Sequence, residues 1–245
     1  MRLNKFLASV GIASRRKCDE IILAGSITVN GKQITELGTQ IDENKDIIIY
    51  KEKTLKLLDQ FFYLKLNKPK GYICTASDDR GRKTVFDIVK MPNVRLFTVG
   101  RLDYNTEGLL LLTNDGEMAQ KLIHPSFEIE KEYYCTIEGE IKQSEIAVLS
   151  AGVVENGVRM PTAKVAVIEA KKVMGGNIAK TRLSVKIKEG QNRQVRRMFE
   201  AIGKEIVLLK RVAIGNIKLG GLQRGEFKKL NKKEMEILGL EDSIN

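Results

Sequence analysis

An Asn-Gly pair between two short alternating segments is the feature that most constrains how this chain folds. Asn30 and Gly31 lie in the middle of SITVNGKQI, and this arrangement is the strongest short-range signal for a β-hairpin. Further forward, Ser14 is placed to cap a helix that ends at Gly25. An earlier helix is predicted by apolar residues at helical spacing, namely Leu3, Phe6, Leu7 and Val10. We therefore expect residues 1–50 to form a small domain of two helices and a hairpin.

The second predicted helix begins with three cations, Arg15, Arg16 and Lys17. Cations at a helix N-terminus oppose the helix dipole and cost about 0.3–1 kcal/mol each. Because helix stability gives no reason for them, we interpret the three as contacts to phosphate groups. A solvated face without a ligand is the alternative, and the sequence leaves it open.

The charge of the whole chain also indicates a polyanionic partner. Lysine and arginine number 42 against 31 acidic residues, a net charge of +11. Residues 186–233 contain 14 basic and 4 acidic residues. Charge alone does not distinguish RNA from DNA or an acidic membrane surface.

Several classes of site are excluded by residues that the chain lacks. His124 is the one histidine, which argues against clustered His/Cys metal sites and most histidine-dependent triads. Neither a G-x-x-x-x-G-K-[ST] nor a G-x-G-x-x-G motif occurs, so a nucleotide cofactor is not expected. Catalysis would have to depend mainly on carboxylate, Tyr, Lys or Arg side chains.

Cysteine spacing and hydropathy indicate a cytoplasmic protein without a membrane span. Cys18, Cys74 and Cys135 are scattered and form no C-x-x-C, which is typical of reduced thiols. The longest apolar runs, such as residues 109–112, have four residues and are far too short to cross a bilayer. The first residues resemble a signal peptide only faintly, so we expect no targeting segment.

Beyond a predicted linker at residues 51–60, the pattern predicts a second domain of the α+β class at residues 61–245. It opens with a strand that Pro69 and Gly71 interrupt. The predicted antiparallel strands 164–169 and 183–188 flank a turn at 174–177. Helices are predicted at 117–123, at 191–202, and at 232–238 with Asn231 as N-cap.

The stretch GRLDYNTEGLLLLTNDG, residues 100–116, is the most informative part of this domain. Gly100 and Gly108 bracket a polar loop, and the leucine run that follows predicts a buried strand. Asp103 would therefore lie in an exposed loop that leads into a rigid strand, a suitable mounting for a reactive group. From spacing alone, Asp103 capping a local turn is the alternative.

Two resemblances give these patterns a function. Residues 1–47 resemble the S4-type RNA-binding domain, and GRLD resembles the catalytic motif of pseudouridine synthases that modify ribosomal RNA. Further segments match the same family in order along the chain, namely KPKGYICT, EKEYYCTIEG and EGQNRQVRRMFEAIG. The resemblance implies a catalytic domain built on a largely antiparallel mixed sheet, with an S4-type domain in front.

The family's catalytic residues map onto Asp103, Tyr133 and Arg196. The resemblance implies that Arg196 pairs with Asp103 and keeps it ionised, while Tyr133 stacks on the uracil and assists removal of the C5 proton. Asp103 either attacks C1′ or takes a proton from C2′, and the sequence does not choose between these routes. No metal or cofactor is implied. Substrate binding is expected of Arg101, Arg193 and Arg197, together with Arg15, Arg16 and Lys17.

The expected substrate is ribosomal RNA or a pre-ribosomal particle, and the expected form is a monomer. The sequence of residues 192–196 is more similar to that of the large-subunit enzymes than to that of the small-subunit enzymes. Small-subunit RNA and a non-catalytic assembly factor remain alternatives. An S4-bearing tRNA ligase is excluded, because its HIGH signature needs two histidines.

Overall fold

The computed structural model describes two compact units. It covers residues 1–57, 60–76, 78–92, 94–155, 157–172 and 178–240. The first unit comprises Met1–Phe62, Met91–Phe97 and Thr113–Gly116, and the second comprises Tyr63–Lys90, Thr98–Leu112 and Glu117–Asn245. The turn predicted at residues 174–177 lies outside the described residues.

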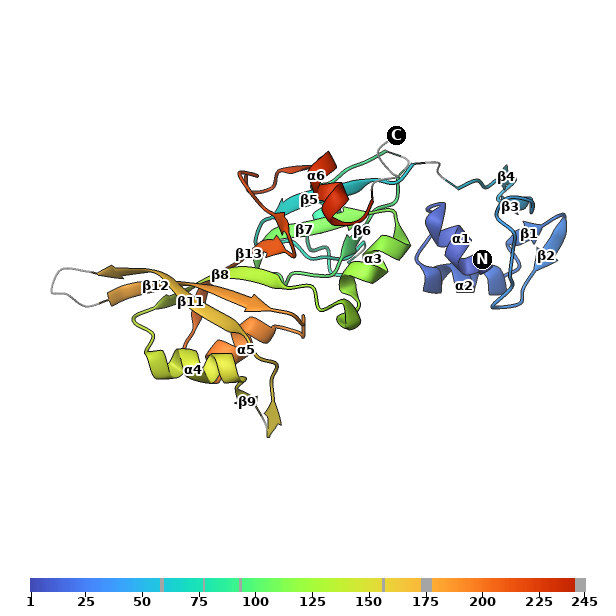
Figure 1. Cartoon of the computed structure of the whole chain (residues 1–245). Helices are drawn as coiled ribbons and strands as arrows, with labels where there is room; N and C mark the ends of the chain where they lie inside the picture. The colour runs from blue at the N-terminus through green and yellow to red at the C-terminus, as the bar shows by residue number, and fades with distance from the viewer. Residues whose placement is uncertain (58–59, 77, 93, 156, 173–177, 241–245) are drawn as a thin grey trace. The chain divides into compact units, whose positions relative to one another are not determined.

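Two short helices open the first unit (Figure 1). α1 spans Leu3–Ser9 and α2 spans Arg15–Leu23. The Ser14 hydroxyl accepts a hydrogen bond from the Lys17 backbone amide at 3.2 Å, which confirms the predicted N-cap. The buried cluster of this unit includes Leu3, Phe6, Leu7, Cys18 and Ile22.

A four-stranded antiparallel sheet in the order β2-β1-β3-β4 completes this unit. Asn30 and Gly31 have φ of 52° and 80° and join β1 (Ile27–Val29) to β2 (Lys32–Ile34), so the predicted hairpin is confirmed. Two strands were not predicted, because they are too short to show a sequence period, namely β3 (Ile48–Tyr50) and β4 (Lys53–Thr54). β4 falls inside the segment predicted as a linker.

The second unit is built on a nine-stranded mixed sheet, as the α+β prediction requires. Its strands follow the order β11 (Lys164–Lys172), β12 (Ile178–Ile187), β8 (Lys131–Glu138), β13 (Ile206–Ile214), β7 (Glu107–Thr113), β5 (Tyr63–Lys68) and β15 (Phe227–Lys229). β6 (Phe97–Val99) pairs with β7, and β14 (Ile217–Lys218) pairs with β13. β13 runs antiparallel to β8 but parallel to β7.

The parallel contact depends on Gly108. Arg211 of β13 is in register with Gly108 of β7. Gly108 has φ of +106°, and a Cβ added there would lie 2.1 Å from the Arg211 backbone oxygen. Only glycine therefore fits, and the close approach brings β13 beside the start of β7.

Helices pack on this sheet, with α4 (Gln143–Ala151) and α5 (Gln194–Glu200) on the same side of β11, β12 and β8 in Figure 1. α3 (Gly116–Ile123) agrees with its prediction, and α6 (Lys232–Ile237) has the predicted Asn231 cap. α5 begins three residues later than predicted, because Arg193 has the left-handed φ of 48° and ends a turn. None of the described helices is long and apolar enough to cross a membrane.

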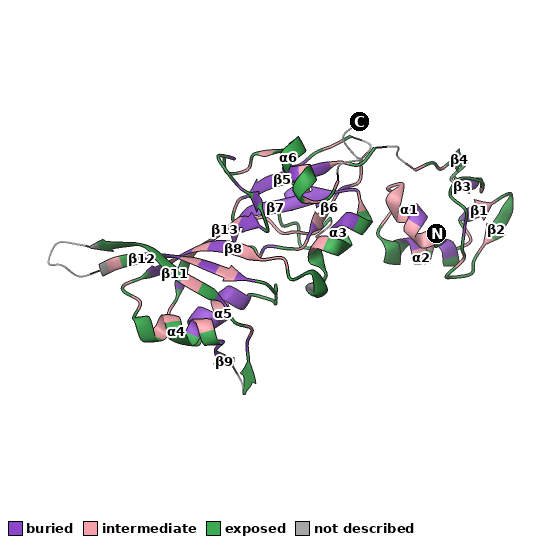
Figure 2. Cartoon of the chain, in the orientation of Figure 1, coloured by how far each residue is buried: buried purple, intermediate pink, exposed green. Residues whose placement is uncertain are grey.

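The core of the second unit centres on β5 and β7, every residue of which is buried (Figure 2). The leucine run 109–112 forms the predicted buried strand. β5 is unusual because it buries Lys65 and Lys68 as well as apolar residues. Lys65 forms an ion pair with Glu234, whereas Lys68 donates hydrogen bonds to the loop that contains Asp103 and Thr106. The remaining short elements are β9 (Val154–Glu155), β10 (Val158–Arg159), η1 (Val85–Asp87) and η2 (Pro125–Phe127).

Candidate active site

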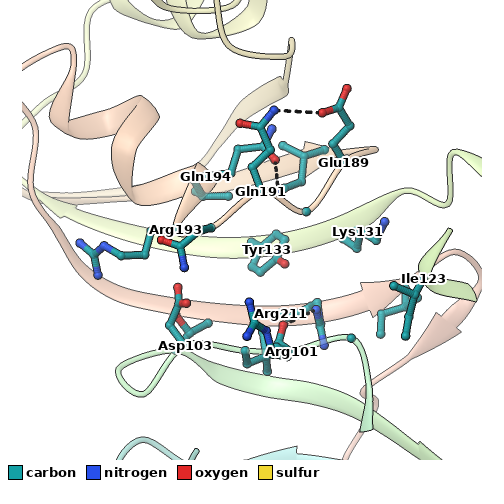
Figure 3. Close-up of a pocket in the computed structure, with 18 of the residues that line it drawn as sticks. Arg101, Asp103, Ile123, Lys131, Tyr133, Glu189, Gln191, Arg193, Gln194 and Arg211 are labelled. Atoms are coloured by element: carbon teal, nitrogen blue, oxygen red, sulfur yellow. Dashed lines mark hydrogen bonds between the residues drawn. The ribbon is translucent and has the colours of Figure 1, made fainter. Parts of the chain in front are cut away.

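A cavity of about 680 Å³ lies within the second unit, a size suited to a nucleoside-sized ligand. Its walls come from the loop before β7, from β8 and β13, and from the segment that joins β12 to α5. Figure 3 shows Asp103 and Arg211 on one side, Gln191 and Glu189 on the opposite side, and Tyr133 between them.

Asp103 is half-buried and lies in the loop between β6 and β7. Gly100, with φ of 72°, starts this loop. Each backbone oxygen of residues 101–106 accepts a hydrogen bond, from Arg211 Nη1, Cys74 Sγ, Lys68 Nζ, Gly71 N, Arg196 Nη2 and again Lys68 Nζ in chain order. The Asp103 carboxylate itself accepts no hydrogen bond from another described residue. The loop is thus fixed through its backbone, and the carboxylate is left available to a ligand.

Lys68 is the central support of this loop and was not identified from the sequence. Its side chain is fully buried, and Nζ donates to the oxygens of Asp103 at 3.1 Å, Thr106 at 2.9 Å and Pro69 at 3.1 Å. Burial lowers the pKa of Lys68, while the nearby Cys74 and Asp103 oppose this effect. The KPKG segment matched a family strand, but no periodicity distinguishes a buried lysine from an exposed one.

Arg196 is placed differently from the expectation that it pairs with Asp103. Its Nη1 donates to the Ile206 oxygen at 3.1 Å and its Nη2 to the Asn105 oxygen at 3.0 Å. Among the ion pairs of the described residues there is none between Arg196 and Asp103. Burial lowers the pKa of Arg196, and the Asp103 charge acts in the opposite direction from a distance. Arg196 therefore supports the backbone two residues beyond Asp103, because its planar fork fits two carbonyl oxygens from separate segments.

Tyr133 lies on β8, is 8% exposed and lines the cavity, as its predicted stacking role requires. Its direct partner across the β8–β13 ladder is Arg211, so both side chains project from the same face of the sheet. Two residues along β8, burial raises the pKa of the Cys135 thiol to about 12. Arg211 is 4% exposed and was missed by the sequence analysis, because nothing in LKRVAIG marks it as different from neighbouring cations.

The structure separates the predicted substrate-binding arginines. Arg101 and Arg193 line the cavity, and both are exposed. Arg197 does not line it and instead forms an ion pair with Glu155. Arg193 also has a carboxylate partner, Glu200 at 3.0 Å, whereas Arg101 forms no ion pair with another of the described residues.

The front unit presents Arg15, Arg16 and Lys17 at the exposed start of α2. Lys17 forms an ion pair with Glu20, whose hydrogen bond raises the pKa of the lysine. In the described part of the chain, no group of three or more His, Cys, Asp or Glu side chains could hold a metal ion.

Comparison with known proteins gives this arrangement a context. The model of the RNA pseudouridylate synthase family matches residues 63–201, and that of the S4 domain matches residues 1–47. The chain is 42% identical to the ribosomal large subunit pseudouridine synthase B of Bacillus subtilis, over 97% of this chain and 95% of that protein. It is 38% identical to the protein of the same name from Salmonella typhimurium, over 97% of this chain and 81% of that protein. A solved pseudouridylate synthase is 29% identical, with a TM-score of 0.67 over 97% of this chain and 99% of that one.

Proposed function

Because the chain belongs to the RNA pseudouridylate synthase family, we propose that it isomerises a uridine of large-subunit ribosomal RNA to pseudouridine. One observation carries this assignment to the residues: the loop of Asp103 is fixed by its backbone beside a cavity that Tyr133 also lines. The names of the relatives from Bacillus subtilis and Salmonella typhimurium support the large-subunit substrate.

Asp103 supplies the carboxylate that the reaction needs. The C1′–N1 bond must break, the uracil must turn, and a C1′–C5 bond must form, without any net redox change. The carboxylate either attacks C1′ or removes a C2′ proton, and both routes need an anionic oxygen free of other partners. Lys68 and Arg196 act on Asp103 through the loop backbone, so they are positioning residues.

Tyr133 provides the face against which the uracil lies. Its ring lines the cavity, and its hydroxyl could take part in removal of the C5 proton when the base is rejoined. The target base must leave its stack in folded RNA, which costs a few kcal/mol. Arg101 and Arg193, exposed at the cavity, are suited to hold the flanking phosphates and so offset that cost.

The front unit is proposed to bind the RNA outside the target nucleotide. Replacing Arg15, Arg16 and Lys17 together with Ala should weaken binding and reduce the slope of log K against log salt by about two, at roughly 0.7–0.9 per lost phosphate contact. Filter binding of a ribosomal RNA fragment at several salt concentrations measures both. An unchanged slope would indicate that these three cations form a solvated face and do not contact phosphates.

The decisive experiment is release of tritium from C5-labelled uridine in ribosomal RNA fragments. We expect release from large-subunit fragments by the wild-type protein and none by Asp103→Asn, which has no anionic oxygen but should fold and bind normally. Release from small-subunit fragments alone would overturn the substrate assignment. Tight binding without release would favour a non-catalytic assembly factor. We further propose that the protein acts as a monomer in the cytoplasm, on RNA or a pre-ribosomal particle.

A further inference from the structure

The cavity collects buried polar atoms that have no hydrogen-bond partner. Six such side-chain atoms occur among the described residues, and three of them belong to residues that line this one cavity. They are Thr106 Oγ1, Gln194 Nε2 and Arg211 Nη2. An unpartnered buried polar group costs about 1–3 kcal/mol, so a concentration of them at one place indicates a ligand that completes them.

Of the three side chains, Arg211 most needs a hydrogen-bond acceptor, because it carries a full charge and is only 4% exposed. Its Nε is held firmly by the Leu109 oxygen at 2.7 Å. Its outer nitrogens are held weakly or not at all, since Nη1 lies 3.5 Å from the Arg101 oxygen and Nη2 has no partner. No carboxylate forms an ion pair with Arg211 within the described part of the chain. A buried guanidinium with incomplete hydrogen bonds carries a large desolvation cost, unless a bound ligand accepts hydrogen bonds from it.

The position of Arg211 identifies which part of the nucleotide it meets. It is the direct cross-strand partner of Tyr133, and such partners have Cβ atoms about 4.5–5.5 Å apart on one face. A uracil that lies against the Tyr133 ring is therefore within reach of Arg211. Figure 3 shows Arg211 beside Asp103, which must approach the ribose. Phosphates are better served by Arg101 and Arg193, which are exposed.

We propose that Arg211 is a further catalytic residue, which donates from its outer guanidinium nitrogens to a uracil carbonyl oxygen and stabilises the anion that leaves C1′. This inference rests on the proposed function. When the C1′–N1 bond breaks, its electron pair stays with the uracil and spreads over N1 and the carbonyl oxygens. Asp103 supplies the new bond to C1′ or takes the C2′ proton.

The negative charge on the base is consumed in the second half of the reaction. C5 forms its bond to C1′ as the bond from C1′ to Asp103 breaks, or, in the other route, as Asp103 returns its proton to C2′ of the unsaturated sugar. The C5 proton then leaves to a base, and N1 takes up a proton to complete the pseudouridine. Arg211 remains protonated throughout, so no oxidant, reductant or further reactant is needed. A fixed, buried cation is most effective at such a developing charge, because it requires no reorganisation at the moment of reaction.

Single-turnover kinetics at saturating RNA test this role. Arg211→Met should lower the rate of uridine consumption about 10²–10³-fold, while the affinity for RNA changes by less than about threefold. Arg211→Lys should retain part of the rate, because it keeps the charge but loses the fork. The matched control is Arg182→Met, which removes an exposed arginine from β12 that lies over Tyr134, outside the cavity. We expect this control to keep the wild-type rate.

A better leaving group distinguishes anion stabilisation from a structural effect. Fluorine at C5 withdraws electrons and stabilises the departing uracil, so RNA with 5-fluorouridine at the target should depend less on Arg211. We expect the rate deficit of Arg211→Met, and of Arg211→Lys if the methionine variant does not fold, to shrink about tenfold or more with this RNA. Nuclease digestion followed by liquid chromatography and mass spectrometry measures the loss of either nucleoside, because uridine and pseudouridine have the same mass and must first be separated by elution.

The possible results separate the two proposals. A wild-type protein that leaves uridine intact refutes the proposed function and the role of Arg211 with it. An active wild type with equally active variants refutes only the role of Arg211. An equal rate deficit with uridine and 5-fluorouridine, or a loss of affinity alone, would also overturn that role, since the first indicates a structural effect and the second a phosphate contact.

Discussion

Replacing Lys68 with Met should destabilise the second unit and slow catalysis at the same time. The substitution keeps a long side chain but removes the donor for the Thr106 and Pro69 oxygens, at 2.9 and 3.1 Å. It also removes one of the two donors to the Asp103 oxygen, which keeps the Thr106 amide at 3.0 Å. Each buried oxygen left without a donor costs about 1–3 kcal/mol, and relief of the buried charge returns part of this. We expect a net loss of about 3 kcal/mol and a fall in Tm of about 6–12 °C for a domain of this size.

The rate should fall as well, because the loop that holds Asp103 loses its central support. A displacement of about 1 Å at a reacting group can cost about 10²-fold, so we expect a loss of about 10–100-fold in single-turnover rate. Circular dichroism melts and tritium release measure the two effects. RNA affinity should change little, since Lys68 is fully buried.

Lys70→Met is the matched control for this experiment. Lys70 is two residues further along, is exposed, and its one hydrogen bond to Val207 is long at 3.4 Å. It should leave Tm within about 2 °C of the wild-type value. A Lys68→Met protein that melts and reacts like the wild type would refute the conclusion that this ammonium group supports the Asp103 loop.

Three further results follow from the structure. Arg196→Met should lower the rate at least about tenfold with little change in RNA affinity, and Arg196→Lys should rescue it poorly, because a lysine cannot hold two separate backbone oxygens. Full rescue by Lys would instead favour a direct pair with Asp103. Gly108→Ala should lower stability by at least about 3 kcal/mol in a thermal melt, because the added Cβ meets backbone at 2.1 Å, and a wild-type Tm would contradict this packing. The Cys135 thiol has its pKa raised from 9.0 to about 12, so between these pH values it stays neutral in the folded protein but ionises in the unfolded chain. Its contribution to the free energy of unfolding is therefore full below pH 9 and is lost as the pH rises towards 12. Denaturant titrations should show that stability falls less steeply across this window in Cys135→Ala, and equal slopes would refute the assignment.

Much of the secondary structure could be predicted because it depends on neighbours in the sequence. Asn30 and Gly31 adopt the positive φ of a hairpin turn with little strain, and Ser14 and Asn231 cap the helices that follow them. The leucine run 109–112 forms a strand buried on both faces. The two-residue β4 and three-residue β3 escaped prediction, because a period cannot be recognised in so few residues.

For the site, the sequence alone determined the chemical groups and the loop that carries the carboxylate. Resemblance selected Asp103 and Tyr133, and the structure places both at one cavity. The tertiary structure alone decided which cations serve them. Arg196 reaches two backbone oxygens, while Arg211 reaches the cavity because a parallel contact at Gly108 sets the register of β13. Register cannot be derived from local sequence, because it depends on strands far apart in the chain, and a shift of one residue would turn each side chain to the opposite face.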